Sequence, residues 1–129
     1  MLAHMLDARL AAEDYCYVTT TGRVTGREHT IEIWFAEHDS TLYLLAGGRH
    51  SSDWVKNIKR KPDVPVRIGG ATFAGRAHIV DDAAEDALAR RLVLATYSAR
   101  NSDLDEWGRT ALPVAIDVAS PMEGDTATV

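Results

Sequence analysis

The stretch TTTGRVTGR, residues 19–27, places two glycines and two arginines directly after a run of β-branched residues. Glycine permits backbone conformations with positive φ and lets the main chain approach a ligand closely. Successive N–H groups in such a turn can form a concave anion seat, and Arg23 and Arg27 add charge that suits phosphate or carboxylate groups. The stretch therefore predicts a site for an anionic cofactor. The alternative interpretation is an ordinary hairpin turn with solvated arginines.

Segments with the composition or alternation of β-strands follow one another on both sides of this turn. Strands are expected at residues 15–21, 28–36, 41–46, 64–68, 71–80 and 113–118. Gly69-Gly70 is a two-residue hairpin turn, residues 37–40 form a polar loop, and Pro65 suggests an edge strand or a bulge. Five or six strands, mostly joined by hairpins, predict an α+β fold whose antiparallel sheet curls into a small barrel.

Helices are expected at three places between or before these strands. Residues 2–11 carry leucines at every fourth position, which indicates a short amphipathic helix. A second helix runs from Asp53 to about Lys61, with Ser52 as the N-cap and Pro62 as the stop. A third begins at the Asp82-x-x-Glu85 capping box and runs to about Thr96. Residues 97–110 read as irregular.

The composition is that of one ordinary globular domain spanning residues 1–129, with an N-terminal helix within residues 1–12 and a frayed tail at residues 120–129. The formal net charge of −5 argues against a general nucleic-acid binder. Cys16 is the single cysteine and indicates a buried thiol in a reducing compartment. With no signal-peptide pattern and no spanning apolar run, a cytoplasmic protein is expected.

Ordinary catalytic patterns are weak in this chain. The five histidines show no helical ligand spacing, so no metal site is expected. The acids at 81–86 are explained by helix capping. Basic residues gather instead between Arg49 and Arg67, where six stand against two acids. If the two glycine turns, at residues 22–27 and 47–49, meet in space, they form a pocket for phosphate and carboxylate groups together with the helix start at Ser52–Asp53. A solvated basic helix end is the alternative.

With these residues in view, the chain resembles the deazaflavin-dependent nitroreductase family, within the split-barrel flavin-binding superfamily. The resemblance rests on four pieces that occur in family order: TTTGR-x-TG at residues 19–26, LLAGG at 44–48, W-x-x-NI-x-x-x-P-x-V at 54–64 and W-x-RT-x-LP at 107–113. It implies a split β-barrel of the pyridoxamine-phosphate-oxidase type that binds coenzyme F420, a deazaflavin with a phosphate and an oligoglutamate tail.

The resemblance also implies which residues hold this cofactor. Arg23 to Gly26 would hold the phosphate and glutamate end, the side chains at 29 and 32 would approach from the second strand, and Trp34 with residues 46–48 would flank the ring. The full implied set is Arg23, Val24, Thr25, Gly26, His29, Glu32, Trp34, Ala46, Gly47, Gly48, Arg49, Asp53 and Trp54. Tyr97 is the candidate proton donor, and simple packing is its alternative role.

The implied activity is hydride transfer from reduced F420 to a small quinone, enone or nitro acceptor, with a homodimer as one option for assembly. The family usually has lysine where this chain has Val24, and Glu32 adds a negative charge. Asn101 and Leu104 fall near positions where nitroimidazole-reducing members carry tyrosine, so quinones or enones are the expected acceptors. The departures motivate two alternatives: FMN as the cofactor, or a non-catalytic protein that binds F420, FMN, haem or a lipid-like ligand.

Overall fold

The structure is a computed structural model that describes residues 10, 12–97 and 105–121. The helix expected at residues 2–11 lies outside the described residues except for Leu10, as do Asn101, Leu104 and the tail beyond Pro121. Within the described ranges, no helix has the length and apolar character needed to cross a membrane.

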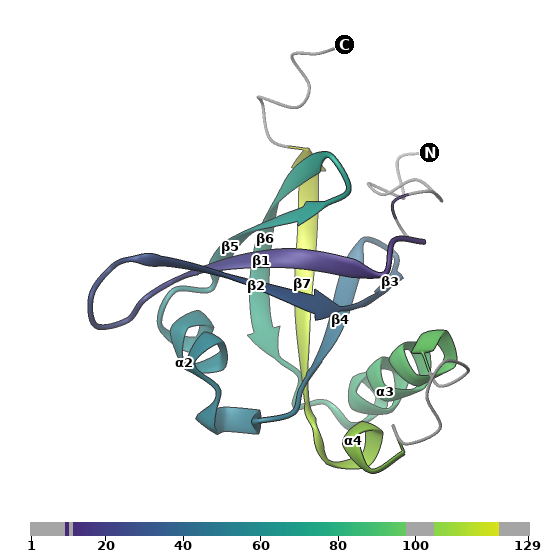
Figure 1. Ribbon diagram of the computed structural model, residues 1–129. Helices are drawn as coiled ribbons and strands as arrows, with labels where there is room; N and C mark the ends of the chain where they lie inside the picture. The colour runs from purple at the N-terminus through teal and green to yellow at the C-terminus, as the bar shows by residue number, and fades with distance from the viewer. Residues whose placement is uncertain (1–9, 11, 98–104, 122–129) are drawn as a thin grey trace.

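The described part of the chain forms one seven-stranded antiparallel sheet in the order β2-β1-β5-β6-β7-β4-β3. The strands are β1 (Tyr15–Thr21), β2 (Glu28–Trp34), β3 (Ala36–His38), β4 (Thr41–Ala46), β5 (Asp63–Ile68), β6 (Ala71–Ile79) and β7 (Leu112–Pro121). The sheet curls so that β1 and β2 pass across β4 and β7, as Figure 1 shows. This confirms the split-barrel architecture expected from the sequence.

Helices close the sheet at two places. The helical elements of the described residues are the 3₁₀ turn η1 (Arg49–Ser51), α2 (Asp53–Arg60), α3 (Ala83–Tyr97) and α4 (Asp105–Thr110). Figure 1 shows α2 beneath the β1–β2 hairpin and α3 with α4 at the other side of the molecule. These two helical groups lie at opposite ends of β2.

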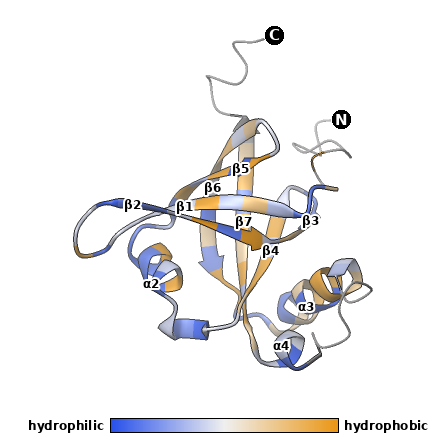
Figure 2. Ribbon diagram, viewed as in Figure 1, coloured by the Kyte–Doolittle hydropathy of each residue, from blue (hydrophilic) through white to orange (hydrophobic). Residues whose placement is uncertain are grey.

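Two groups of buried apolar side chains hold these layers together. One fills the inside of the curled sheet and includes Val18, Leu44, Val66 and Ile116, all fully buried. The other lies between the sheet and α3, around Val93 and its neighbours. Figure 2 shows β4 and β7 hydrophobic along most of their length, since they contribute to both groups.

Helix α2 forms as the sequence predicts, with small differences at its ends. Ser52 precedes the first helical residue but makes no side-chain cap hydrogen bond. Trp54 and Ile58 pack toward the core, and Lys61 closes the last turn by donating its N–H to the Asn57 carbonyl before Pro62. The helix therefore presents one face to β1, which brings its polar residue Asn57 into the interior.

Three expectations need correction. The strand expected over residues 28–36 is broken at Phe35, so that β2 and β3 are separate strands. The loop expected over residues 37–40 is shorter, because β3 continues to His38. Asp39 and Ser40 form the remaining turn, and both have positive φ as in a type I′ turn. Residues 105–110 form α4 instead of irregular chain.

Pro65 lies in an interior strand, because β5 pairs with both β1 and β6. Pairing with β1 involves only Val66 and Arg67, so Pro65 stands where that ladder has ended. The missing N–H of the proline therefore breaks no bond to β1.

Candidate functional site

A cavity of about 340 Å³ opens beside the Gly22–Gly26 turn, between the start of β2 and α2. We call it the arginine cavity; its lining is Thr20, Gly22, Arg23, Val24, Thr25, His29, Ile31, Asp53, Trp54 and Asn57. The first glycine turn and the start of α2 thus meet here, whereas the second glycine turn, residues 47–49, does not line this cavity. Six implied cofactor residues share this cavity: Arg23, Val24, Thr25, His29, Asp53 and Trp54.

Asn57 fixes the position of Arg23 from inside the fold. The Asn57 Oδ1 atom accepts one hydrogen bond from the Arg23 backbone N–H at 3.2 Å and one from its Nη1 at 2.9 Å. Its Nδ2 donates to the Thr20 hydroxyl at 3.1 Å, and both Asn57 and Thr20 are buried. Asn57 is a site residue that the sequence interpretation missed, although it lies in one of the quoted motifs.

The second terminal nitrogen of Arg23, Nη2, pairs with the Asp53 carboxylate at 3.3 Å. The side chain of Asp53 is 87% exposed and that of Arg23 is 30% exposed. The guanidinium is therefore held by a buried neutral amide on one side and by an exposed carboxylate on the other. The Asp53 partner is therefore the one that solvent reaches.

The turn itself is tightly closed around its glycines. Gly22 donates to the Arg27 carbonyl at 2.7 Å, and a Cβ at Gly22 would lie only 3.1 Å from that same oxygen. Gly26 has φ of 76°, which favours glycine. Within the described residues, the N–H groups of Val24 and Thr25 make no hydrogen bond, so they can donate to an anion.

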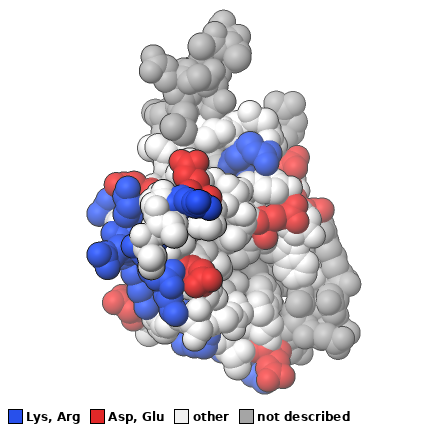
Figure 3. Space-filling view, turned by 60° about the vertical axis from the view of Figure 1, so that its left-hand side comes forward, with Lys and Arg blue, Asp and Glu red and all other residues white. Residues whose placement is uncertain are grey.

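Further basic side chains surround the arginine cavity without lining it. Exposed cations are found in the turn and along α2: Arg27, Lys56, Lys59, Arg60 and Lys61. Figure 3 shows Lys and Arg gathered on this side of the molecule. The Lys59 Nζ atom lies 2.6 Å from His50 Nδ1. The predicted basic region therefore faces solvent around the cavity and gives it a positive surrounding.

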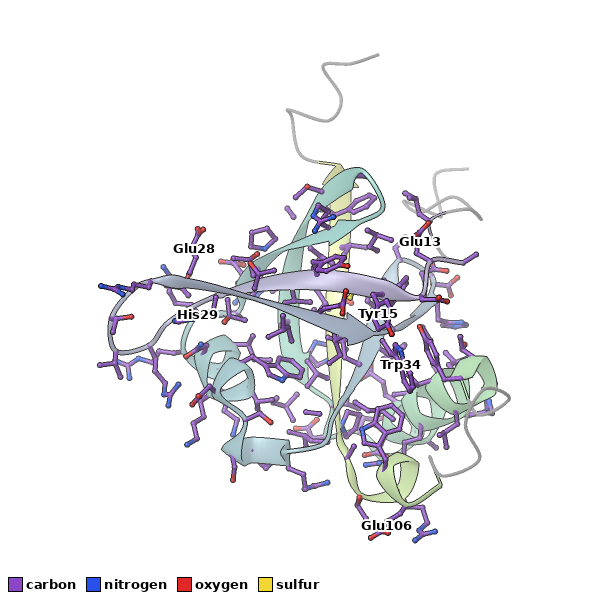
Figure 4. All side chains as sticks on the ribbon, viewed as in Figure 1. Glu13, Tyr15, Glu28, His29, Trp34 and Glu106 are labelled. Atoms are coloured by element: carbon purple, nitrogen blue, oxygen red, sulfur yellow. The ribbon has the colours of Figure 1, made fainter. Side chains whose placement is uncertain are left out.

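A second cavity of about 540 Å³ lies at the other end of β2. We call it the tryptophan cavity; its lining is Tyr15, Glu32, Ile33, Trp34, Leu45 and Trp107. Figure 4 shows His29 and Trp34 at opposite ends of β2, with α2 below the first and α3 and α4 below the second. Strand β2 thus contributes to two cavities, one with charged side chains in its lining and one with the two tryptophans.

The tryptophan cavity has a rigid aromatic wall. The rings of Trp34 and Trp107 meet edge to face with centroids 5.8 Å apart. Trp34 also stacks on Tyr97, with centroids 4.4 Å apart and planes inclined by 4°. Such pairs favour one orientation of each ring. The wall is suited to a flat, apolar ligand.

Tyr97 is a core residue in this structure. Its side chain is fully buried, and its hydroxyl accepts from the Phe35 N–H at 3.2 Å. It contacts the carbonyls of Asp14 at 2.7 Å and Phe35 at 3.0 Å, either of which can accept its proton. Because the hydroxyl is committed to the backbone and lines neither cavity, its position favours the packing role over that of proton donor.

Glu32 does not face the arginine cavity. It stands opposite Tyr17 in the β1–β2 ladder, and its carboxylate accepts the Tyr17 hydroxyl proton at 2.6 Å. That hydrogen bond raises the pKa of Tyr17, and the Arg67 guanidinium lies 4.2 Å from the centre of the Tyr17 ring. The negative charge of Glu32 is thus placed at the tryptophan cavity, away from Arg23.

The other implied residues lie along the chain between the cavities or outside them. Ala46 is buried, so its side chain belongs to the core. A Cβ at Gly47 would lie 3.6 Å from the Trp107 ring, which puts Gly47 beside the tryptophan cavity. Gly48 packs on Ser52, and the Arg49 guanidinium donates to the Thr110 carbonyl. Gly26 borders neither cavity.

Cys16 and the clustered carboxylates add no further site. Cys16 is buried, and desolvation raises the pKa of its thiol to about 12. Asp82 caps α3 by accepting the Glu85 N–H at 2.9 Å, while the Glu85 carboxylate accepts from Tyr43. Among the residues that the structure describes, no group of three or more His, Cys, Asp or Glu is placed to hold a metal ion.

The chain is similar to known proteins in sequence and in fold. A family model described as F420H(2)-dependent quinone reductase matches residues 5–119. No curated protein matches the sequence. The fold is shared with a structure described as an F420-H2 dependent reductase (TM-score 0.65, 22% identity), which covers 90% of this chain and 98% of that one.

Two further structures show how widely the fold is used. One is described as a putative pyridoxamine 5′-phosphate oxidase from Listeria innocua (TM-score 0.67, 17% identity, 89% of this chain and 91% of that one). The other is described as a domain-swapped dimer (TM-score 0.61, 22% identity, 90% and 84%). At these identities the likeness shows a common split-barrel fold.

Proposed function

The chain belongs to the F420H2-dependent quinone reductase family, and from this premise we propose that it reduces a quinone or a related activated alkene bound in the tryptophan cavity. Membership makes it an F420-dependent reductase, in agreement with the sequence-based expectation. The identity of the acceptor is the proposal. The observation that carries it is the apolar wall of Trp34, Trp107, Ile33 and Leu45 at the end of β2.

The donor set of the arginine cavity fits the anionic end of F420. Arg23 supplies a guanidinium, Thr25 a hydroxyl, and the N–H groups of Val24 and Thr25 are available. A Cβ at Gly22 would lie within 3.2 Å of neighbouring atoms, so the turn can close this tightly only with glycine at that position. Charge-assisted hydrogen bonds of this kind are the stronger class and suit a phosphate. We assign phosphate and glutamate binding to this cavity.

When bound, reduced F420 supplies a hydride. The protein holds the cofactor, orients the acceptor and keeps water away from the acceptor. Gly47 lies beside Trp107, and because it has no side chain the flat ring of the acceptor can come close to the backbone there. Trp34, held by its contacts with Tyr97 and Trp107, forms with Trp107 an ordered aromatic wall against which a planar acceptor can lie.

The acceptor class can be tested with a steady-state panel. We expect F420H2 oxidation to be fastest with a naphthoquinone, slower with a cyclic enone and slowest with a nitroimidazole, because an apolar planar wall favours the quinone ring. FMNH2 in place of F420H2 is the cofactor control. A panel in which the nitroimidazole is the best acceptor would contradict the assignment.

We also propose that the protein forms a homodimer. A structure of the same fold is described as a domain-swapped dimer, which supports a pairwise assembly of this architecture. Light scattering after size-exclusion chromatography should give twice the chain mass, and a monomer mass would refute the proposal.

A further inference from the structure

We propose that Asp53 is a built-in competitor for the anionic tail of the cofactor. In this view Asp53 occupies the outer nitrogen of Arg23 in the free protein and is displaced when the tail binds, so that it limits the affinity of the cavity for anions. The inference rests on the proposed function, because it concerns how the arginine cavity receives F420. It changes the role of Asp53 from a residue that closes the pocket to one that competes with the cofactor for Arg23.

The inner side of Arg23 is a permanent anchor. Its backbone N–H and Nη1 both donate to Asn57 Oδ1, and Asn57 is 3% exposed. Breaking these bonds would leave a buried amide oxygen without its donors, which is costly. Arg23 therefore keeps its place while its outer nitrogen changes partner.

The outer side of Arg23 is exchangeable. Nη2 meets Asp53 at 3.3 Å, and the Asp53 side chain is 87% exposed. Ion pairs that stand in water are weak, because solvent screens the attraction and two side chains lose freedom. A phosphate or carboxylate oxygen arriving at Nη2 makes the same type of bond that Asp53 gives up, so the exchange has little net cost.

Asp53 also lowers the positive potential of the cavity. With His29 neutral, the charged side chains in the cavity lining are Arg23 and Asp53, and their opposite charges cancel. Val24 adds no charge to the lining, although it is 86% exposed. The lysines of α2 do not line this cavity. The charged side chains of the lining therefore balance, and the positive charge around the cavity comes from the exposed cations outside it.

This arrangement distinguishes a tethered anion from a free one. The tail of F420 is brought to Arg23 by the rest of the cofactor, which gives it a high effective concentration against Asp53. Inorganic phosphate has no such help and must displace Asp53 on its own. Displacing Asp53 raises the Kd of both anions by a similar factor, and the cofactor, which is also held by its other parts, is the one that still binds tightly.

The test is a fluorescence titration of F420, without acceptor, into the wild type, Asp53→Asn, Arg23→Gln and the double variant. Asp63→Asn is the matched control, because Asp63 also pairs with an arginine at the surface (Arg76, 2.8 Å) but lies outside this cavity. At low salt we expect Asp53→Asn to lower the Kd about threefold to fivefold. Asp63→Asn should leave the Kd unchanged, and thermal unfolding checks that every variant is folded.

The double variant separates exchange at Arg23 from general repulsion. We expect Asp53→Asn to have no effect in the Arg23→Gln background, and to let inorganic phosphate compete with F420 at lower concentration in the wild-type background. An unchanged or raised Kd for Asp53→Asn, or equal tightening in both backgrounds, would overturn the inference. Because binding is measured without an acceptor, a failure of quinone reduction alone would refute the proposed acceptor and leave this result standing.

Discussion

Trp34 and Tyr97 stack face to face, with ring centroids 4.4 Å apart and planes inclined by 4°, so a wall of the tryptophan cavity rests on a fully buried tyrosine. The hydroxyl of the same tyrosine holds the backbone at Phe35, where β2 gives way to β3. One residue of α3 thus fixes both the bend in the strand and the ring that faces the ligand.

Replacing Tyr97 with phenylalanine should therefore affect stability more than chemistry. The Phe35 N–H and the carbonyl that accepts the tyrosine proton would lose a buried partner, which costs about 1–3 kcal/mol. We expect a lower Tm, with the pH profile of quinone reduction unchanged. If Tyr97→Phe removed an ionisation from the kcat profile while the Tm stayed the same, the tyrosine would be a proton donor after all.

Replacing Asn57 with alanine should weaken cofactor binding through Arg23. The variant removes the acceptor for two hydrogen bonds from Arg23, so we expect the KM for F420H2 to rise about tenfold with little change in kcat. Thr20→Val is the comparison, because it removes the other partner of Asn57 and leaves the bonds to Arg23 in place. Equal KM changes in both variants would mean that Asn57 acts only through general stability.

Cys16 should be inert in the folded protein. Burial raises the pKa of its thiol to about 12, so almost no thiolate is present at mildly alkaline pH. We expect iodoacetamide to leave the native protein unmodified and to label it in denaturant, as read by intact-mass analysis. Native labelling at the rate of a free thiol would show that β1 opens readily.

Tyr43 should make stability fall at alkaline pH. Burial, together with the hydrogen bond to Glu85, raises the pKa of this phenol from 10.0 to about 12. The folded state favours the neutral phenol, so the stabilisation is fully present below pH 10 and is lost as the pH rises toward 12. Chemical unfolding between these values should show this loss in the wild type and a smaller loss in Tyr43→Phe.

The sequence predicted best those elements whose patterns are local. The bounds of β1 and β4 were predicted correctly because uninterrupted β-branched or apolar runs end at glycine turns. The bend at Phe35 and the helix α4 were missed. The first depends on the hydrogen bond that the Phe35 N–H donates to the Tyr97 hydroxyl, 62 residues away, and the second is a six-residue polar helix with little periodicity.

The site shows the same division. The glycine turn and Arg23 were singled out from local chemistry and do line a cavity with the start of α2, but the second glycine turn, expected to join them, does not. Asn57 was missed as an anchor because its partners Arg23 and Thr20 lie more than 30 residues away. That Glu32 and Trp34 face a different cavity from Arg23 follows from the course of β2, which a linear pattern does not reveal.

The most direct test of the two-cavity account is to measure the KM values for F420H2 and for a naphthoquinone in Arg23→Gln and Trp107→Leu. Arg23 lines one cavity and Trp107 the other. We expect Arg23→Gln to raise the KM for F420H2 with little change in the KM for the quinone. We expect Trp107→Leu to raise the KM for the quinone with little change in the KM for F420H2. Absence of quinone reduction in the wild type, or the opposite assignment of the two effects, would contradict it.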